Sequence, residues 1–260
     1  MEKKKVIKLL IIIFIIIAIL AAATITILYF VKKSKFDYQI SNVEEYNYSI
    51  LYRDDKYGVI NKEGEIVVEP TYTNVQIPNP SRPLFICVSE YNRELGEYEN
   101  KVLNENKEQI LTTYDSVSAI SVDSTDTNVP YEKSVLKYRK DGKYGLIDFD
   151  GNEITKPIYD DIRGLGYKEG TLLVKQGEKY GVININGAEM VEIKYDSVSA
   201  DNYYDSQTKS KNAGFIISEK TEEGYRYGYI DYKGKRILKP EFTKIERVNE
   251  IQGDDIYFIA

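Results

Sequence analysis

Two Ser-x-x-Lys segments come closest, in residue type and spacing, to a catalytic motif. They pair Ser134 with Lys137 and Ser206 with Lys209. In enzymes that use this spacing the lysine helps to activate the serine, and a Lys-Thr-Gly element completes the site. The sequence contains no Lys-Thr-Gly. Because the first segment also lies in a predicted strand and the second in a polar loop, neither predicts a serine enzyme.

Carboxylates are the next candidates for chemistry. Asp148, Asp150 and Gly151 superficially resemble a calcium loop. An EF-hand needs glycine at its sixth position and glutamate at its twelfth, and both are missing, so a tight turn explains these residues better. Adjacent acidic residues occur at Glu44 and Glu45, Asp54 and Asp55, and Asp254 and Asp255. We interpret these pairs as solvated turns and edges, with general acid–base catalysis as the alternative.

The sequence contains no histidine and one cysteine, Cys87. Intramolecular disulfides, Cys/His zinc sites and His-dependent triads are therefore excluded. Cys87 has no adjacent base, so we interpret it as a buried strand residue rather than a reactive thiol. We expect no catalytic residue, no metal and no cofactor.

Tyrosine is abundant, with 24 residues in the chain. Most are expected in the core or on sheet faces. Tyr91, Tyr203 and Tyr204 differ because they lie among polar neighbours in the non-repeat segments 91–98 and 199–212. Rigid aromatic side chains on loops commonly contact partners. These three tyrosines are the predicted binding residues.

Residues 9–31 form an apolar run without a charge. As a helix this run spans about 34 Å, enough for a hydrocarbon core of about 30 Å. We predict a short basic cytoplasmic tail (1–8), a transmembrane signal anchor (9–31) and a juxtamembrane linker (32–46). Signal-peptide cleavage is the alternative, but it would leave an apolar N-terminus. Lysines flank both ends almost equally, and the short basic head favours an exported C-terminal domain.

The rest of the chain is acidic. Residues 1–35 hold seven lysines and one glutamate, which leaves 28 basic and 40 acidic side chains and a net charge of −12. A nucleic-acid partner requires a basic face, so nucleic acid is excluded. The hydrophobic content of 42% is typical of a folded domain.

Residues 47–260 contain an internal repeat. Four cores align without a gap, at 56–75, 143–162, 179–198 and 226–245. Each begins with a basic residue, Tyr and Gly, and a second Gly follows six positions after the first. These columns hold Tyr57, Gly58 and Gly64; Tyr144, Gly145 and Gly151; Tyr180, Gly181 and Gly187; and Tyr227, Gly228 and Gly234. A closing aromatic residue and then Val or Ile follow. A fifth core, at 99–117, has lost both glycines.

The repeat reads as strands, because β-branched and aromatic residues alternate with period 2 and no helical period persists after residue 35. The second Gly supplies the positive φ of a hairpin turn, and a further strand precedes each core. One such meander cannot bury its apolar face alone, so neighbours must stack. The prediction is an all-β repeat array of five three-stranded antiparallel meanders, propeller-like or open and curved, preceded by one transmembrane helix.

Two columns and the last segment receive specific interpretations. The first Gly lies inside a strand, where glycine lowers stability, so we expect a neighbouring aromatic ring to pack on its bare backbone. The basic residue before each Tyr is interpreted as protection of a strand edge, with a periodic row of cations on one face as the alternative. Residues 255–260 are similar to a further first strand.

The Lys-Tyr-Gly column, the second Gly and the Pro-x-aromatic column together resemble the bacterial WG-repeat family over about residues 47–260. Tyrosine stands where the family has its signature tryptophan, and the chain contains no Trp. The resemblance implies β-meander or propeller-like arrays that serve as binding or scaffolding surfaces. It implies no shared catalytic residue.

We therefore expect a membrane-anchored, non-catalytic interaction domain at the bacterial cell envelope, which binds a protein or a surface polymer. One alternative is an extracytoplasmic hydrolase that uses carboxylates of an inserted loop. The other is a cytoplasm-facing sensor or adaptor, if the orientation in the membrane is inverted.

Overall fold

The computed structural model describes residues 24, 39–41, 47–93, 97–122, 130–166, 170–205, 209–247 and 258–259. Among them Thr24 is helical, and all regular elements of the repeat body are strands. No helix among these residues is long and apolar enough to cross a membrane. Apart from Thr24, the predicted anchor at 9–31 lies outside the described residues.

The described strands form six antiparallel sheets, which we number in chain order. Sheet 1 contains β1 (Gln39–Ser41), β2 (Tyr48–Arg53), β3 (Lys56–Asn61) and β4 (Ile66–Tyr72). Sheet 2 contains β5 (Asn74–Gln76), β6 (Leu84–Asn92), β7 (Glu97–Asn104) and β8 (Gln109–Ile110). Sheet 3 contains β9 (Ser116–Ser118), β10 (Leu136–Lys140) and β11 (Lys143–Ile147).

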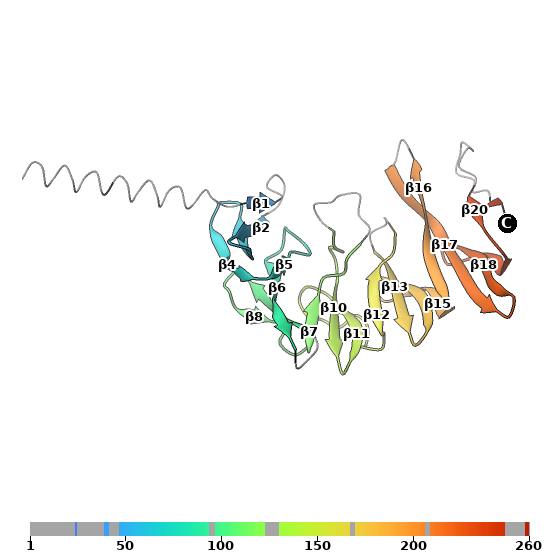
Figure 1. Ribbon diagram of the computed structural model, residues 1–260, viewed down its shortest axis with the longest axis horizontal. Helices are drawn as coiled ribbons and strands as arrows, with labels where there is room; N and C mark the ends of the chain where they lie inside the picture. Colours follow the sequence, from blue (N-terminus) through green and yellow to red (C-terminus); the bar gives the residue numbers. More distant parts are fainter. Residues whose placement is uncertain are drawn as a thin grey trace, which may run out of the picture.

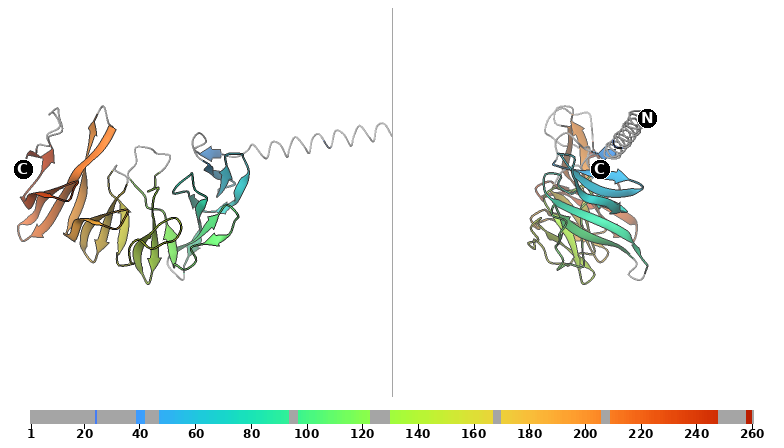
Figure 2. Two further views of the ribbon diagram at one scale, coloured as in Figure 1. Left: turned by 180° about the vertical axis from the view of Figure 1, so that it is seen from behind. Right: turned by 90° about the vertical axis from the view of Figure 1, so that its left-hand side faces the viewer.

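Sheet 4 contains β12 (Asp161–Gly164), β13 (Thr171–Gln176), β14 (Lys179–Asn184) and β15 (Glu189–Tyr195). Sheet 5 contains β16 (Ser197–Asp205), β17 (Lys209–Thr221), β18 (Gly224–Asp231) and β19 (Arg236–Phe242). Sheet 6 contains β20 (Glu246–Arg247) and β21 (Phe258–Ile259). Figure 1 shows these sheets side by side along an open arc, with sheets 1 and 5 near its opposite ends, and Figure 2 shows the same order from behind.

The all-β prediction is confirmed, but the unit has four strands rather than three. The additional strand is the first strand of the sheet, and in sheets 2 to 5 it contains the Val or Ile that follows the closing aromatic residue of the preceding core. These residues are Val75, Val117, Ile162 and Val198. In sheet 3 the fourth strand is reduced to two isolated bridges, Tyr144 with Tyr159 and Ile147 with Glu153. The end of each core therefore opens the next sheet.

The register repeats from sheet to sheet. In sheets 1, 3, 4 and 5 the tyrosine of the Tyr-Gly pair lies opposite the closing aromatic residue of the same core. The pairs are Tyr57 with Tyr72, Tyr144 with Tyr159, Tyr180 with Tyr195, and Tyr227 with Phe242. Equal spacing in the sequence thus corresponds to equal pairing in space.

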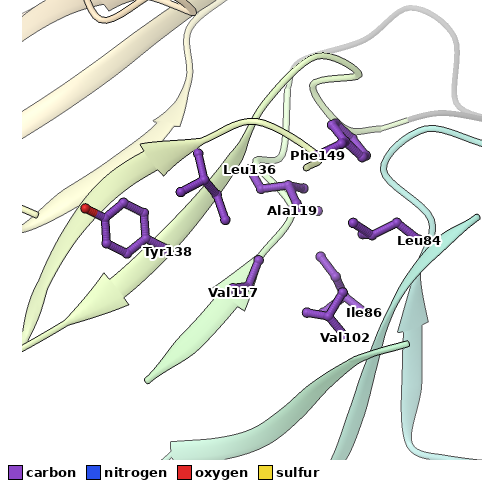
Figure 3. Packing of buried hydrophobic residues seen from close by; sticks show 9 residues of the cluster. Leu84, Ile86, Val102, Val117, Ala119, Leu136, Tyr138 and Phe149 are labelled. Carbon is purple, nitrogen blue, oxygen red and sulfur yellow. The ribbon is translucent and has the colours of Figure 1, made fainter. Parts of the chain in front are cut away.

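The apolar core lies between the sheets. Four clusters of buried residues fill the four contacts between successive sheets from 1 to 5. Figure 3 shows the cluster between sheets 2 and 3, in which Leu84, Ile86 and Val102 meet Leu136 and residues near it. Each fully buried aliphatic side chain of this kind stabilises the fold by roughly 1.5–3 kcal/mol. Stacking, and not any single sheet, therefore provides the core.

Second strands of the interior sheets are buried on both faces. Along β6, Leu84 and Ile86 belong to the cluster with sheet 3, whereas Phe85 and Cys87 belong to the cluster with sheet 1. Successive side chains of a strand point to opposite faces, so a strand between two sheets must be apolar at consecutive positions. This explains the continuous apolar runs LFICV and TLLV in the sequence.

The first Gly of each core makes room for a bulge in the fourth strand. The register between third and fourth strands shifts beside this residue in sheets 1, 4 and 5. A Cβ added to Gly58 would lie 2.4 Å from the Val68 carbonyl oxygen, and one added to Gly181 would lie 2.6 Å from that of Val191. The prediction of an aromatic ring at this place is wrong for three sheets. It holds at Gly145, where the ring of Tyr138 lies within 2.6 Å of the added Cβ.

The second Gly has a positive φ in all four intact cores, as predicted: 84° at Gly64, 86° at Gly151, 78° at Gly187 and 83° at Gly234. An Asn or Asp three residues earlier closes the same turn. The side chain of Asn184, for example, accepts the backbone N–H groups of Asn186 at 2.9 Å and Ala188 at 3.0 Å. Such Asx turns explain the polar residue in this column.

Candidate functional site

The order of the strands in each meander gives the stack two rims, one at each end of the strands. Successive turns of an antiparallel meander alternate between its ends, so the connections from first to second strands share one rim and those from second to third strands share the other. We call these the loop rim and the hairpin rim. For sheets 2 to 5 the hairpin rim is the lower edge in Figure 1.

The longest insertions lie on the loop rim, and one insertion, at 93–96 in sheet 2, lies on the hairpin rim. The connections of the loop rim in sheets 2 to 5 are residues 77–83, 119–135, 165–170 and 206–208. The hairpin rim has two-residue turns in sheets 1, 3, 4 and 5, at 54–55, 141–142, 177–178 and 222–223. In repeat proteins, insertions confined to one face often mark the binding face.

A buried carboxylate fixes part of the loop rim. Glu132 is 1% exposed, and its two oxygens accept the backbone N–H groups of Ser134 at 3.0 Å and Gly170 at 2.8 Å. The side-chain amide of Asn79 donates to the Lys133 carbonyl at 3.0 Å. The connections of sheets 2, 3 and 4 are thereby joined. Sequence reasoning missed Glu132, because its long-range partner, Gly170, lies in another sheet.

Tyr91 is paired with a second exposed tyrosine on the hairpin rim. It lies in β6 opposite Tyr98 of β7, and the two ring centroids are 5.2 Å apart in an edge-to-face arrangement. Tyr91 is 50% exposed and Tyr98 is 60% exposed. Exposed aromatic side chains with polar neighbours can form contacts with partners. The two tyrosines at the ends of the non-repeat segment 91–98 were a signal for Tyr98 that sequence reasoning did not use.

Tyr203 and Tyr204 lie in a two-stranded arm at the loop rim. Their backbones pair with Lys211 and Ser210 of β17, whereas β18 pairs with β17 only from Gly214 onward. Figure 1 shows this end of β16 and β17 projecting above sheet 5. The structure therefore does not bring these two tyrosines together with Tyr91, and the binding role of all three stays a prediction.

The basic residue before Tyr-Gly holds a connector between sheets. The ammonium group of Lys143 donates to Asp160 at 2.5 Å, and that of Lys179 donates to Asp196 at 2.7 Å. The other oxygen of Asp196 accepts the backbone N–H of Lys220 in the next sheet at 2.7 Å. The bond from Lys179, together with that N–H, lowers the pKa of Asp196. The observed role of these two lysines is therefore neither the protection of a strand edge nor a place in a free row of cations.

The residues proposed for catalysis have structural partners. Lys137 donates to the Ile162 carbonyl at 3.0 Å and lies 3.6 Å from Asp161, so its ammonium group is directed toward sheet 4. Asp148 accepts the backbone N–H groups of Asp150 and Asn152, and its hydrogen bond from the Asn152 amide lowers its pKa. Asp54 and Asp55 form a hairpin turn with φ values of 51° and 60°. Glu44, Glu45, Asp254 and Asp255 lie outside the described residues.

The described residues contain neither a candidate metal site nor a reactive thiol. Across these residues there is no group of three or more His, Cys, Asp or Glu side chains that could hold a metal ion. Cys87 is fully buried in β6, and burial raises the pKa of its thiol to about 12. A thiol in this environment remains protonated at neutral pH and is a poor nucleophile.

A stack of antiparallel sheets, four of them each built on one Tyr-Gly core, defines an all-β repeat protein. The sequence model of the WG containing repeat matches residues 57–78, 144–180, 180–204 and 227–250. The predicted resemblance is thereby confirmed, since the model of the WG containing repeat matches the chain at each of the four intact cores. The degenerate core at 99–117 lies in none of the matched segments.

Comparison with other proteins adds two findings. No curated protein matches the chain by sequence. Among solved structures, the chain is similar to the WD40 domain of SCAP from fission yeast, with 12% sequence identity and a TM-score of 0.29. The match covers 82% of this chain and 60% of that chain.

Proposed function

We propose that this protein is a non-catalytic interaction scaffold, anchored in the membrane by residues 9–31, whose repeat domain lies at the cell envelope and binds a protein or a surface polymer. The observation that carries the proposal is the separation of the stack into a buried apolar interior and a rim that holds the longest inserted connections. The WG repeats support a binding role, because repeat arrays commonly present extended surfaces to partners.

Site-specific photocrosslinking in native membranes tests the interaction function. A photoreactive residue at Tyr91 on the hairpin rim or at Ser81, an exposed residue on the loop rim, reports on the two rims, and one at Lys239, an exposed residue of β19, is the control position. We expect discrete adducts from at least one rim position that exceed those from Lys239. Equal, diffuse labelling at all three positions would argue against a scaffold with a defined partner.

Protease treatment of intact cells tests the location. The proposal predicts that the repeat domain is digested from outside while a cytoplasmic marker protein survives. A repeat domain that resists digestion until the cells are lysed would contradict export and favour the cytoplasm-facing sensor or adaptor. Glu132 and Asp148 give the hydrolase alternative no support, since both carboxylates are occupied by backbone N–H groups.

A further inference from the structure

The face of sheet 5 that points away from sheet 4 is incompletely covered. In sheet 4 the corresponding face is sealed by sheet 5, and Leu173, Val191 and Tyr195 are 3%, 2% and 3% exposed. By register, their equivalents in sheet 5 are Ile216, Leu238 and Phe242. All three equivalents are only half-buried. We call this surface the terminal face.

Among the described residues, sheet 6 has no counterpart of the third strand by which sheets 2 to 5 cover the sheet before them. Each preceding contact between sheets receives one apolar residue from the third strand of the following sheet. These residues are Leu103, Ile147, Ile183 and Ile230. Sheet 6, in the part of the chain that the structure describes, consists of β20 and β21, which pair antiparallel through Glu246 with Ile259 and Arg247 with Phe258. It contributes no third-strand residue to the terminal face.

Sheet 5 covers part of its own face with a tyrosine. Tyr229 takes the place that valine has in sheet 4 (Val182), is 1% exposed, and donates to Asp201 at 2.8 Å. Its ring lies along the sheet over Gly214, where an added Cβ would be 2.6 Å from the tyrosine hydroxyl. The ring of Tyr229 does not cover Leu238 and Phe242 on β19, which are half-buried.

We propose that the terminal face binds a β-hairpin of the Tyr-Gly type supplied by a partner protein, which adds its first strand to β21 and places an apolar residue against Leu238 and Phe242. The surface continues an interface that the chain itself forms four times, so the partner that fits is the hairpin that fills those four places. Strand addition supplies main-chain hydrogen bonds, and the apolar residue supplies selectivity. This inference rests on the proposed interaction function and assigns it one site and one kind of partner.

A synthetic peptide of residues 179–195, the β14–β15 hairpin of this chain, serves as the probe. Its binding to the full, detergent-solubilised chain is followed by fluorescence anisotropy. Leu238→Lys alters the terminal face, and Ile237→Lys is the matched control, because Ile237 is the adjacent residue on the other face of β19 and is 48% exposed. We expect saturable binding, at least tenfold weaker for Leu238→Lys and unchanged for Ile237→Lys. A peptide with Ile183→Lys should not bind.

Circular dichroism melting establishes that both protein variants are folded. Absence of peptide binding, or equal binding by both variants, would overturn the proposal. Self-association of the chain that is abolished by Leu238→Lys, without peptide binding, would also overturn it and would assign the face to a second copy. Failure of the peptide while rim positions still give discrete adducts would reject this site and leave the scaffold function standing.

Discussion

Sheets 2 and 4 are built on the same plan, yet sheet 2 has lost both glycines that sheet 4 retains. In sheet 4 the third strand passes Gly181 beneath a bulged fourth strand that continues to Tyr195. In sheet 2 the fourth strand ends at Ile110, and the next residue, Leu111, has a positive φ of 57°. Lys101 stands at the position of Gly181, and no bulge is formed there because β8 pairs only through Ile110 and Gln109.

This comparison shows on which structural contact each repeated residue of the core depends. The first Gly is required by the bulge and becomes dispensable when the fourth strand is short. The turn residue behaves differently, because Asn104 accepts the N–H groups of Asn106 and Glu108 just as Asn184 does in sheet 4. Sheet 2 even keeps the positive φ of the second Gly, at 65° on Lys107.

The largest effect is expected at the first Gly. Gly181→Ala places a Cβ 2.6 Å from the Val191 carbonyl oxygen and should lower the free energy of unfolding by about 2–3 kcal/mol. Lys101→Ala should change it by less than about 0.5 kcal/mol, because this site is not crowded by a fourth strand. Urea unfolding followed by circular dichroism measures both. Similar losses in the two variants would show that the bulge is not the reason for the glycine.

Substitutions at the position of the second Gly should change the stability of the fold in opposite directions in sheets 4 and 2. Gly187→Ala forces an L residue to a φ of 78° and should destabilise by about 1–2 kcal/mol. Lys107→Gly removes the same strain and should stabilise by about 0.5–1 kcal/mol. Thermal unfolding of the two variants beside the parent chain provides the measurement. A destabilised Lys107→Gly would mean that the lysine side chain has a role beyond the turn.

The turn asparagines should respond alike. Asn104→Ala and Asn184→Ala each remove two hydrogen bonds to backbone N–H groups and should each lower the free energy of unfolding by about 1 kcal/mol. Urea midpoints compare them directly. If only Asn184→Ala were harmful, sheet 2 would not be an equivalent member of the stack.

The smallest effect concerns the connector between sheets 4 and 5. A double-mutant cycle with Lys179→Ala and Asp196→Asn should give a coupling energy below about 1 kcal/mol that shrinks with added salt. Because the pKa of Asp196 is lowered in the folded state, its contribution is complete above the unfolded pKa of about 3.9 and is lost as the pH falls through the folded value. Melting temperatures of parent and Asp196→Asn should therefore converge in acid.

The sequence was sufficient for the features that one core encodes locally. Hairpin strands follow from period 2, and the turns at Gly64 and Gly187 follow from the need for a positive φ. The first strands β5, β9 and β12 were missed because three or four residues, such as Asn74–Gln76, carry no usable periodicity and were assigned to the end of the preceding core.

Features that depend on a second sheet were not predictable in the same way. The reason for Gly58 lies in the backbone of β4, and the partner of Lys179 lies 17 residues further along the chain. Of the exposed tyrosine pair on the hairpin rim only Tyr91 was predicted, because its pairing with Tyr98 depends on the register of β6 and β7. Glu132 was missed for the same reason as the connector, since Gly170 belongs to another sheet.

Amide hydrogen exchange of the intact chain tests the central claim most directly, namely that sheets 1 to 5 are equivalent members of one stack in which each protects the next. The account predicts strong protection of the third strands in all five sheets, with β7 of the degenerate sheet 2 as slow as β14 of sheet 4. Exchange of residues 97–104 at the rate of an unfolded segment, with β14 protected, would contradict it.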